Sequence, residues 1–145
     1  MTPRRVFVDT GAWFAVQTKD DALHAVAAAS LRVLIDRGVA LITTNQVIGE
    51  TYTLLRVVTG YESAARFLEV VGSAKRLDRV FVGREVEQRA VVLLERFRDH
   101  DFSFVDATSF AVMQARRLRW AFAFDAHFAT AGFVRIPWDL PADQI

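Results

Sequence analysis

Three aspartates in this sequence stand where short apolar runs end. Asp9 follows Arg-Val-Phe-Val, Asp106 follows Phe104 and Val105, and Asp125 follows Phe-Ala-Phe. In open parallel sheets, ligands bind in the crevice at the carboxyl ends of the strands, so side chains at these junctions converge even when they are far apart in the chain. We therefore expect the three carboxylates to meet at one edge of a sheet.

A fourth acid, Glu50, belongs to a segment that reads as a helix. It lies three residues after Val47 and four before Leu54, which places it alongside an apolar stripe formed by Val47, Leu54 and Val58. This spacing predicts that the carboxylate of Glu50 is not on the solvated face of the helix.

Crowding several carboxylates together is unfavourable. Asp106 shares a helix face with Phe110 and Met113 by its spacing, so its side chain also leans toward the packed side. At ~4 Å and an effective dielectric near 20, each pair of carboxylates repels by about 4 kcal/mol. A hard divalent cation, Mg²⁺ or Mn²⁺, would remove that repulsion. The sequence therefore predicts an acidic metal site made of Asp9, Glu50, Asp106 and Asp125.

Each acid also has a structural interpretation. Any of the three aspartates could be a helix N-cap, because each precedes a helical or turn segment and Asp is a preferred capping residue. Glu50 could be a partly buried glutamate paired with Arg56 or Arg89. These alternatives stay open for each residue taken alone.

The elements that would hold the acids alternate between strand and helix. Parallel strands need crossover connections of helical length, so this order predicts an α/β/α sandwich of three layers with a mainly parallel central sheet. The expected strands are Arg4–Val8, Ala40–Thr43, Arg79–Val82, Ala121–Phe124 and Phe133–Ile136. The expected helices are Asp21–Asp36, Asn45–Val58, Tyr61–Val71, Gly83–Arg98 and Asp106–Leu118.

Length and composition narrow the class of protein. A chain of 145 residues with 52% hydrophobic side chains predicts a single domain, residues 1–145, with a short polar tail at 137–145. Cysteine is absent, which excludes thiolate metal sites and cysteine nucleophiles. No apolar run is long enough for a signal peptide or a membrane span, so we expect a cytoplasmic protein with no membrane partner.

Four segments together resemble a known family. VFVDTGAWFA, NQVIGETYTLL, FSFVDATSFAVM and AFAFDAHFATAGF correspond, in order, to the four acidic motifs of the PIN-domain ribonucleases, and specifically of the VapC-type toxins. The resemblance runs from about Arg4 to Ile136. It implies a PIN-like fold and carries the family's acids onto Asp9, Glu50, Asp106 and Asp125, with Thr10 and Thr108 as supporting hydroxyls.

The resemblance implies a metal-dependent endoribonuclease that hydrolyses RNA phosphodiester bonds. A metal-activated water would attack phosphorus in line, so no protein nucleophile is needed. We expect Asp9 and Asp106 to be the main ligands of Mg²⁺ or Mn²⁺, Asp125 to serve a second metal or a water-mediated contact, and Glu50 to orient the water or join the coordination sphere.

Basic residues would guide the RNA substrate. Arg116, Arg117 and Arg119 cluster near the end of the predicted last helix and are candidate RNA contacts, although cations there also complement the helix dipole. His127, two residues after Asp125, could touch a phosphate, but a lone surface histidine is more often incidental. The net charge is only +1, so the total charge does not by itself favour binding to nucleic acid.

Partners follow from the resemblance too. A VapC-type toxin implies a cognate antitoxin, and we expect a homodimer with Trp13, Phe14 and Tyr52 at an interface, unless these aromatics simply fill the core.

Two other classes of function remain. A PIN-like module that binds RNA or protein without catalysis would keep the fold. A phospho-acceptor or phosphatase domain would use Asp9 as a nucleophile, but the second Asp expected two residues later is absent, and so are GxxxxGK[ST] and GxGxxG.

Overall fold

A single five-stranded sheet forms the centre of the computed structural model, which describes residues 3–145. Every neighbouring pair of strands is parallel, and their order is β3-β2-β1-β4-β5. The expected α/β sandwich with a parallel sheet is therefore confirmed. The strands are β1 (Arg5–Val8), β2 (Ala40–Thr44), β3 (Leu77–Val80), β4 (Trp120–Phe122) and β5 (Val134–Ile136).

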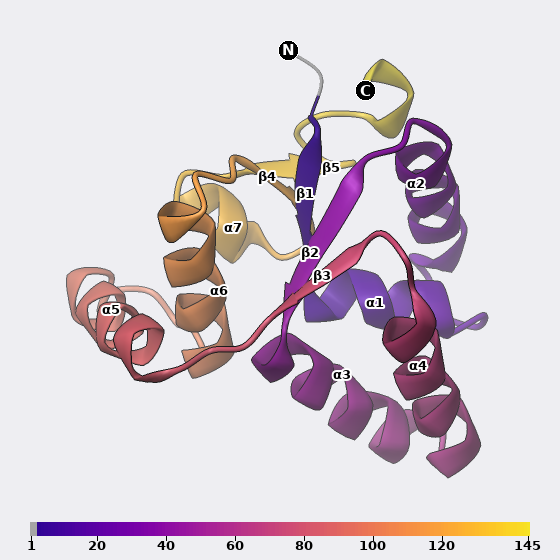
Figure 1. The fold of residues 1–145 in the computed structure, drawn as a ribbon, viewed down its shortest axis with the longest axis horizontal. Coiled ribbons are helices and arrows are strands. Elements are labelled where there is room, and N and C mark those ends of the chain that lie inside the picture. Colours follow the sequence, from indigo (N-terminus) through magenta and orange to yellow (C-terminus); the bar gives the residue numbers. More distant parts are fainter. Residues whose placement is uncertain (1–2) are drawn as a thin grey trace.

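Helices cover both faces of this sheet (Figure 1). In Figure 1, α1, α2 and α4 lie on one side, α5, α6 and α7 lie on the other, and α3 runs below the sheet and contacts α6. Right-handed crossovers explain this division, because the chain moves outward from β1 in one direction to β3 and then in the opposite direction from β4 to β5. The helices are α1 (Thr10–Gln17), α2 (His24–Asp36), α3 (Asn45–Val58), α4 (Tyr61–Ser73), α5 (Arg84–Arg96), α6 (Phe104–Ala115) and α7 (Ala126–Thr130), with a short 3₁₀ turn, η1 (Ala142–Gln144).

Two expected boundaries are wrong in ways that affect the site. The strand expected at Ala121–Phe124 begins at Trp120 and ends at Phe122, so Asp125 follows a short loop and not the strand itself. The helix expected from Asp106 begins at Phe104, because Ser103 is its N-cap. Asp106 is consequently a residue of the first helical turn and does not mark a strand end.

The orientation of α3 also differs from the expected one. Its buried residues are Val47, Ile48, Thr51 and Leu55. Leu54 and Val58 are 39% and 59% exposed, so they do not belong to the packed face. The helix is capped by Thr44, whose hydroxyl accepts a hydrogen bond from the Val47 amide, while Asn45 accepts one from the amide of Val82.

The aromatic side chains that were expected at an interface are mostly internal. Trp13 is 5% exposed, packs edge-on against Phe67 with ring centroids 5.7 Å apart, and donates its indole N–H to Thr43. Phe14 and Tyr52 are half-buried and pack against the core. Trp13 therefore fills the core, whereas an interface role of Phe14 and Tyr52 stays a prediction.

The last residues return to the body of the protein. Trp138 packs edge-on against Phe124, with ring centroids 5.3 Å apart. Ile145 is 4% exposed, its carbonyl accepts a hydrogen bond from Arg37, and η1 contacts α2. Within residues 3–145, none of the helices has the length and apolar character that crossing a bilayer requires.

The orientation of α3 can be tested by a pair of truncations. Replacing the fully buried Leu55 with Ala should lower the free energy of unfolding by about 2–5 kcal/mol, because it removes a core side chain and leaves a cavity. Val58→Ala, on the same helix but largely exposed, should change it by less than about 0.5 kcal/mol. Urea denaturation of both variants measures the difference, and equal losses would contradict the observed orientation.

Candidate functional site

Asp9 lies at the point where the sheet changes its direction of winding. It follows β1, which has β2 on one side and β4 on the other, so the crevice for a ligand opens between β1 and β4. The backbone amide of Asp9 donates to the Phe122 carbonyl at 3.1 Å, and its carbonyl accepts from the Trp13 amide at 3.1 Å. Strand pairing and the start of α1 thus fix this residue from both sides.

The carboxyl group of Asp9 is buried and close to the other acids. The residue is 6% exposed, and burial is the main reason that its pKa rises to about 7. A backbone hydrogen bond from Thr10 lowers this pKa, whereas the negative charges of Asp106, Glu50 and Asp125 raise it further. The fold therefore brings all four candidate acids into one electrostatic environment.

Asp106 reaches the cluster from the first turn of α6. Its carboxylate takes part in a capping box: Oδ2 accepts the Ser103 amide at 3.0 Å, and the Ser103 hydroxyl accepts the Asp106 amide at 2.9 Å. The same Oδ2 lies 3.0 Å from Nδ1 of His127, and the side chain is 13% exposed. Both hydrogen bonds from the described residues end on Oδ2, which leaves Oδ1 for another partner.

Asp125 is the N-cap of α7, with Oδ1 accepting the backbone amide of His127 at 2.8 Å. The His127 ring lies against both aspartates, since its Nδ1 is 3.5 Å from the same Asp125 oxygen. Asp106, Asp125 and His127 each offer a ligand atom, and these atoms lie within 4.8 Å of one another. From the sequence, His127 is a candidate phosphate contact of a kind that is more often incidental. Its position two residues after Asp125 is the one sequence signal that it belongs to the site.

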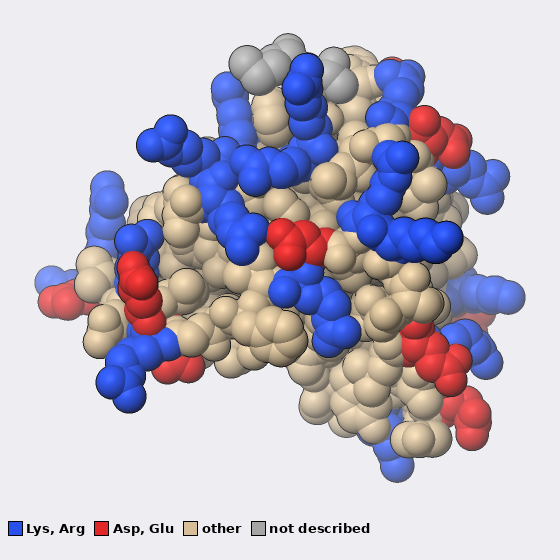
Figure 2. Space-filling view, in the orientation of Figure 1, with Lys and Arg blue, Asp and Glu red and all other residues tan. Residues whose placement is uncertain are grey.

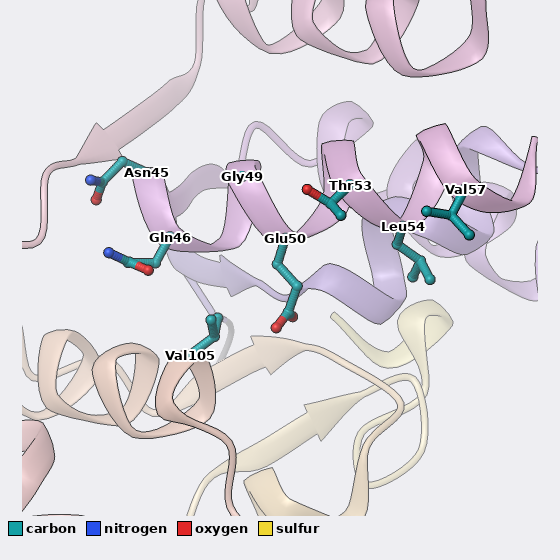
Figure 3. A pocket seen from close by; sticks show the side chains of 8 residues that line it. All are labelled: Asn45, Gln46, Gly49, Glu50, Thr53, Leu54, Val57 and Val105. Carbon is teal, nitrogen blue, oxygen red and sulfur yellow. The ribbon is translucent and has the colours of Figure 1, made fainter. Parts of the chain in front are cut away.

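Glu50 is placed differently from the expectation. It is exposed on α3 and lines a groove of about 580 Å³ between α3 and the start of α6 (Figure 3). In Figure 3 its carboxylate points into the gap on the side of Val105, one residue before Asp106. Among the described residues it has no ion pair; Arg89 pairs with Glu85, and Arg56 lies over Tyr61. Glu50 therefore faces the site across solvent and is not packed beside it.

The two threonines differ in how their hydroxyls are bound. Thr10 is 6% exposed, and its Oγ1 is buried without a hydrogen-bond partner among residues 3–145. Thr108 is fully buried, and its hydroxyl donates to the Val105 carbonyl at 2.9 Å. Of these two threonines, Thr10 is the one with an unpartnered buried oxygen, and it lies next to Asp9 in the chain.

The three candidate RNA-binding arginines lie away from the acids. Arg116 is the C-cap of α6, about 15 Å along the helix axis from Asp106. It pairs with Asp78 at 2.9 Å and its carbonyl accepts from Arg5, while Arg119 lies over the Trp120 ring. Basic side chains predominate on the face of the molecule drawn in Figure 2. Contact of Arg116, Arg117 and Arg119 with RNA stays a prediction.

These features fit a hard divalent cation. Oxygen donors are what Mg²⁺ and Mn²⁺ prefer, and Asp9 combines a buried carboxyl with an unpaired neighbouring hydroxyl. Helix capping gives Asp106 and Asp125 a structural reason to be where they are. Asp9 has no such reason, because its side chain makes no capping hydrogen bond. A structural explanation therefore fails at the most buried acid.

Comparisons with known proteins identify the family of this chain. The family model for the PIN domain matches residues 6–134. The chain is 38% identical over 135 residues to the 23S rRNA-specific endonuclease VapC20 of two Mycobacterium tuberculosis strains, CDC 1551 and H37Rv, covering 90% of this chain and 97% of the relative. The crystal structure of M. tuberculosis VapC20, described as a sarcin-ricin loop cleaving toxin, superposes with a TM-score of 0.81 and 36% identity, covering 89% of this chain and 96% of that one.

The raised pKa of Asp9 predicts that its ionisation lowers the free energy of unfolding as pH rises. Because the folded-state pKa of about 7 lies above the ordinary value of 3.8 for an aspartate, the raised pKa of Asp9 should cost the metal-free protein stability as pH rises between these values. Asn cannot ionise, so Asp9→Asn should become more stable than the wild type by up to about 4 kcal/mol as pH increases from about 4 to 7.

Urea denaturation in EDTA across that range measures the difference, from which the titration of the groups that do not interact with Asp9 cancels. Asp20→Asn, at an exposed site, is the matched control and should track the wild type. A constant difference between Asp9→Asn and the wild type across the whole range would show that the Asp9 carboxyl is not destabilised by burial.

Proposed function

This chain belongs to the PIN-domain family, and from that premise we propose that it is a VapC-type toxin, an endoribonuclease that uses Mg²⁺ or Mn²⁺ to hydrolyse RNA phosphodiester bonds. The observation that carries the proposal is the buried carboxyl of Asp9 between β1 and β4, surrounded by the charges of Asp106, Glu50 and Asp125. The matched segment, residues 6–134, contains all four acids and would act as one nuclease domain.

The acids would have different roles in binding the metal. Asp9 and Oδ1 of Asp106 would be the principal ligands, because the first is buried and the second is free of hydrogen bonds from the described residues. Asp125, with its side chain 45% exposed, would hold a second cation or a bridging water. When bound, the cation would polarise a phosphodiester oxygen and lower the pKa of a coordinated water.

Glu50 suits a different role. It projects from α3 toward the groove, so its carboxylate can accept a proton or a hydrogen bond from the water that attacks phosphorus. The attacking water adds its oxygen to phosphorus as the bond to the 3′ oxygen breaks. The products would carry a 5′ phosphate and a 3′ hydroxyl.

The substrate we propose first is 23S ribosomal RNA. This rests on the relative that the chain matches over 90% of its length, which is a 23S rRNA-specific endonuclease. The groove beside Glu50 has both amide and apolar side chains, Asn45, Gln46, Leu54 and Val57 among them, and is the surface where sequence preference would be set. The phosphatase alternative is weaker, because Gly11 stands where a second catalytic Asp would be needed.

Two substitutions at the start of α6, one at Asp106 and one at its N-cap Ser103, separate catalysis from capping. Asp106→Asn keeps an acceptor for the Ser103 amide and removes a negative charge, so the metal-free melting temperature should be unchanged or higher. It should also lose cleavage by about 100-fold or more, together with the rise in melting temperature that millimolar Mg²⁺ gives the wild type. Ser103→Ala should do the reverse, losing about 1 kcal/mol of stability while it keeps cleavage and metal response.

The measurements are sequencing of RNA ends after incubation with ribosomes and thermal melting with and without Mg²⁺. Full metal-dependent cleavage by Asp106→Asn would overturn the mechanism. Loss of cleavage in Ser103→Ala at temperatures where it is folded would show that the cap, and not the carboxylate, is what the reaction needs.

We also propose that the toxin is a homodimer and binds an inhibitory antitoxin. Because Trp13 is internal, the interface must use other apolar side chains, and α3 exposes Val57 and Val58 at 78% and 59%. Val57→Lys should therefore halve the mass found by light scattering at tens of micromolar, with little change in melting temperature. A wild type that is monomeric at this concentration would contradict the dimer.

A further inference from the structure

His127 contacts two of the acids in the site at once. Its backbone amide donates to Oδ1 of Asp125 at 2.8 Å. Its ring Nδ1 lies 3.0 Å from Oδ2 of Asp106 and 3.5 Å from the same oxygen of Asp125. The residue thus connects α6 to the loop between β4 and α7, two segments that no strand pairing joins.

The direction of the ring hydrogen bond follows from the chemistry of its partner. An ionised carboxylate only accepts hydrogen bonds, so Nδ1 must carry the proton that is shared with Asp106. Together with the Ser103 amide, this bond occupies Oδ2 of Asp106. The carboxylate is therefore held with Oδ1 directed away from both donors.

Aromatic packing holds the ring in place. His127 lies against Phe102, with ring centroids 5.0 Å apart, and Phe102 packs edge-on against Phe110 at 5.1 Å. Phe110 in turn packs edge-on against Phe128 in α7, at 4.9 Å. The imidazole is 28% exposed and stands on a continuous aromatic column of the core. A rigid support of this kind is what a residue needs to fix another side chain's orientation.

We propose that His127 is a positioning residue that orients Asp106 and Asp125 so that each presents one oxygen to the metal. The proposal rests on the proposed function and adds to it a residue that is not one of the four acids. Hydrogen bonds to ligating carboxylates of this sort typically contribute 10–100-fold to metal affinity. His127 acts through the aspartates and needs no contact with the RNA.

Two substitutions separate the hydrogen bond from the packing. His127→Phe keeps a ring against Phe102 but has no donor. His127→Asn loses the ring but carries its amide nitrogen on Cγ, as histidine carries Nδ1, and can donate to Asp106. His100→Phe is the matched control, because His100 also stacks on Phe102, at 5.7 Å, and is exposed.

The readout is Mn²⁺ binding by each folded variant, measured from the electron paramagnetic resonance signal of free Mn²⁺. His127→Phe should weaken binding by about tenfold or more, His127→Asn should recover most of the loss, and His100→Phe should match the wild type. A Phe variant that binds Mn²⁺ as tightly as the wild type, or an Asn variant no better than Phe, overturns the proposal and leaves the nuclease function intact. Absence of Mn²⁺ binding by the wild type contradicts the proposed function itself.

A second measurement needs no substitution. Nitrogen NMR of the metal-free wild type should show His127 protonated at Nδ1. A ring with a bare Nδ1 and a proton only on Nε2 could not donate to Asp106 and would overturn the inference, whatever the stability of the variants.

Discussion

A buried, unpaired carboxyl at the switch point of the sheet is the constraint on which the rest of the structure depends. Asp9 is held by the last hydrogen bonds of β1, and the described residues place no Lys or Arg in an ion pair with it. Burial and three neighbouring acids raise its pKa to about 7, so the apo protein carries an electrostatic cost near neutral pH. Either protonation of the carboxyl or a bound cation relieves that cost without dismantling the sheet.

The protein limits this cost by giving two of the acids a structural role. Asp106 completes the capping box of α6 and Asp125 caps α7, so each is hydrogen-bonded through one oxygen to backbone amides. Such bonds fix the side chain, while the second oxygen stays available. Capping and metal binding were alternatives when only the sequence was considered. In the structure they are compatible, because a carboxylate has two oxygens.

The sequence predicted what depends on local pattern and missed what depends on packing between distant segments. Apolar runs ending in Asp identified Asp9 and the parallel sheet, since buried strands have a clear signature. The orientation of α3 was wrong because Leu54 and Val58 are apolar yet exposed, so hydrophobic spacing pointed to the wrong face. His127 was missed because its partner, Asp106, is 21 residues away and belongs to another helix.

Part of the exposed apolar face of α3 lies beside the candidate site. Val57 and Leu54 line the same groove as Glu50, and Val105 of α6 closes its other side. A partner that buries Val57, such as the second copy of the proposed dimer, therefore lies beside Glu50 at the edge of this groove. Leu54, one of the two apolar residues whose spacing pointed to the wrong face of α3, is thus explained by its position, because it borders the groove beside Glu50.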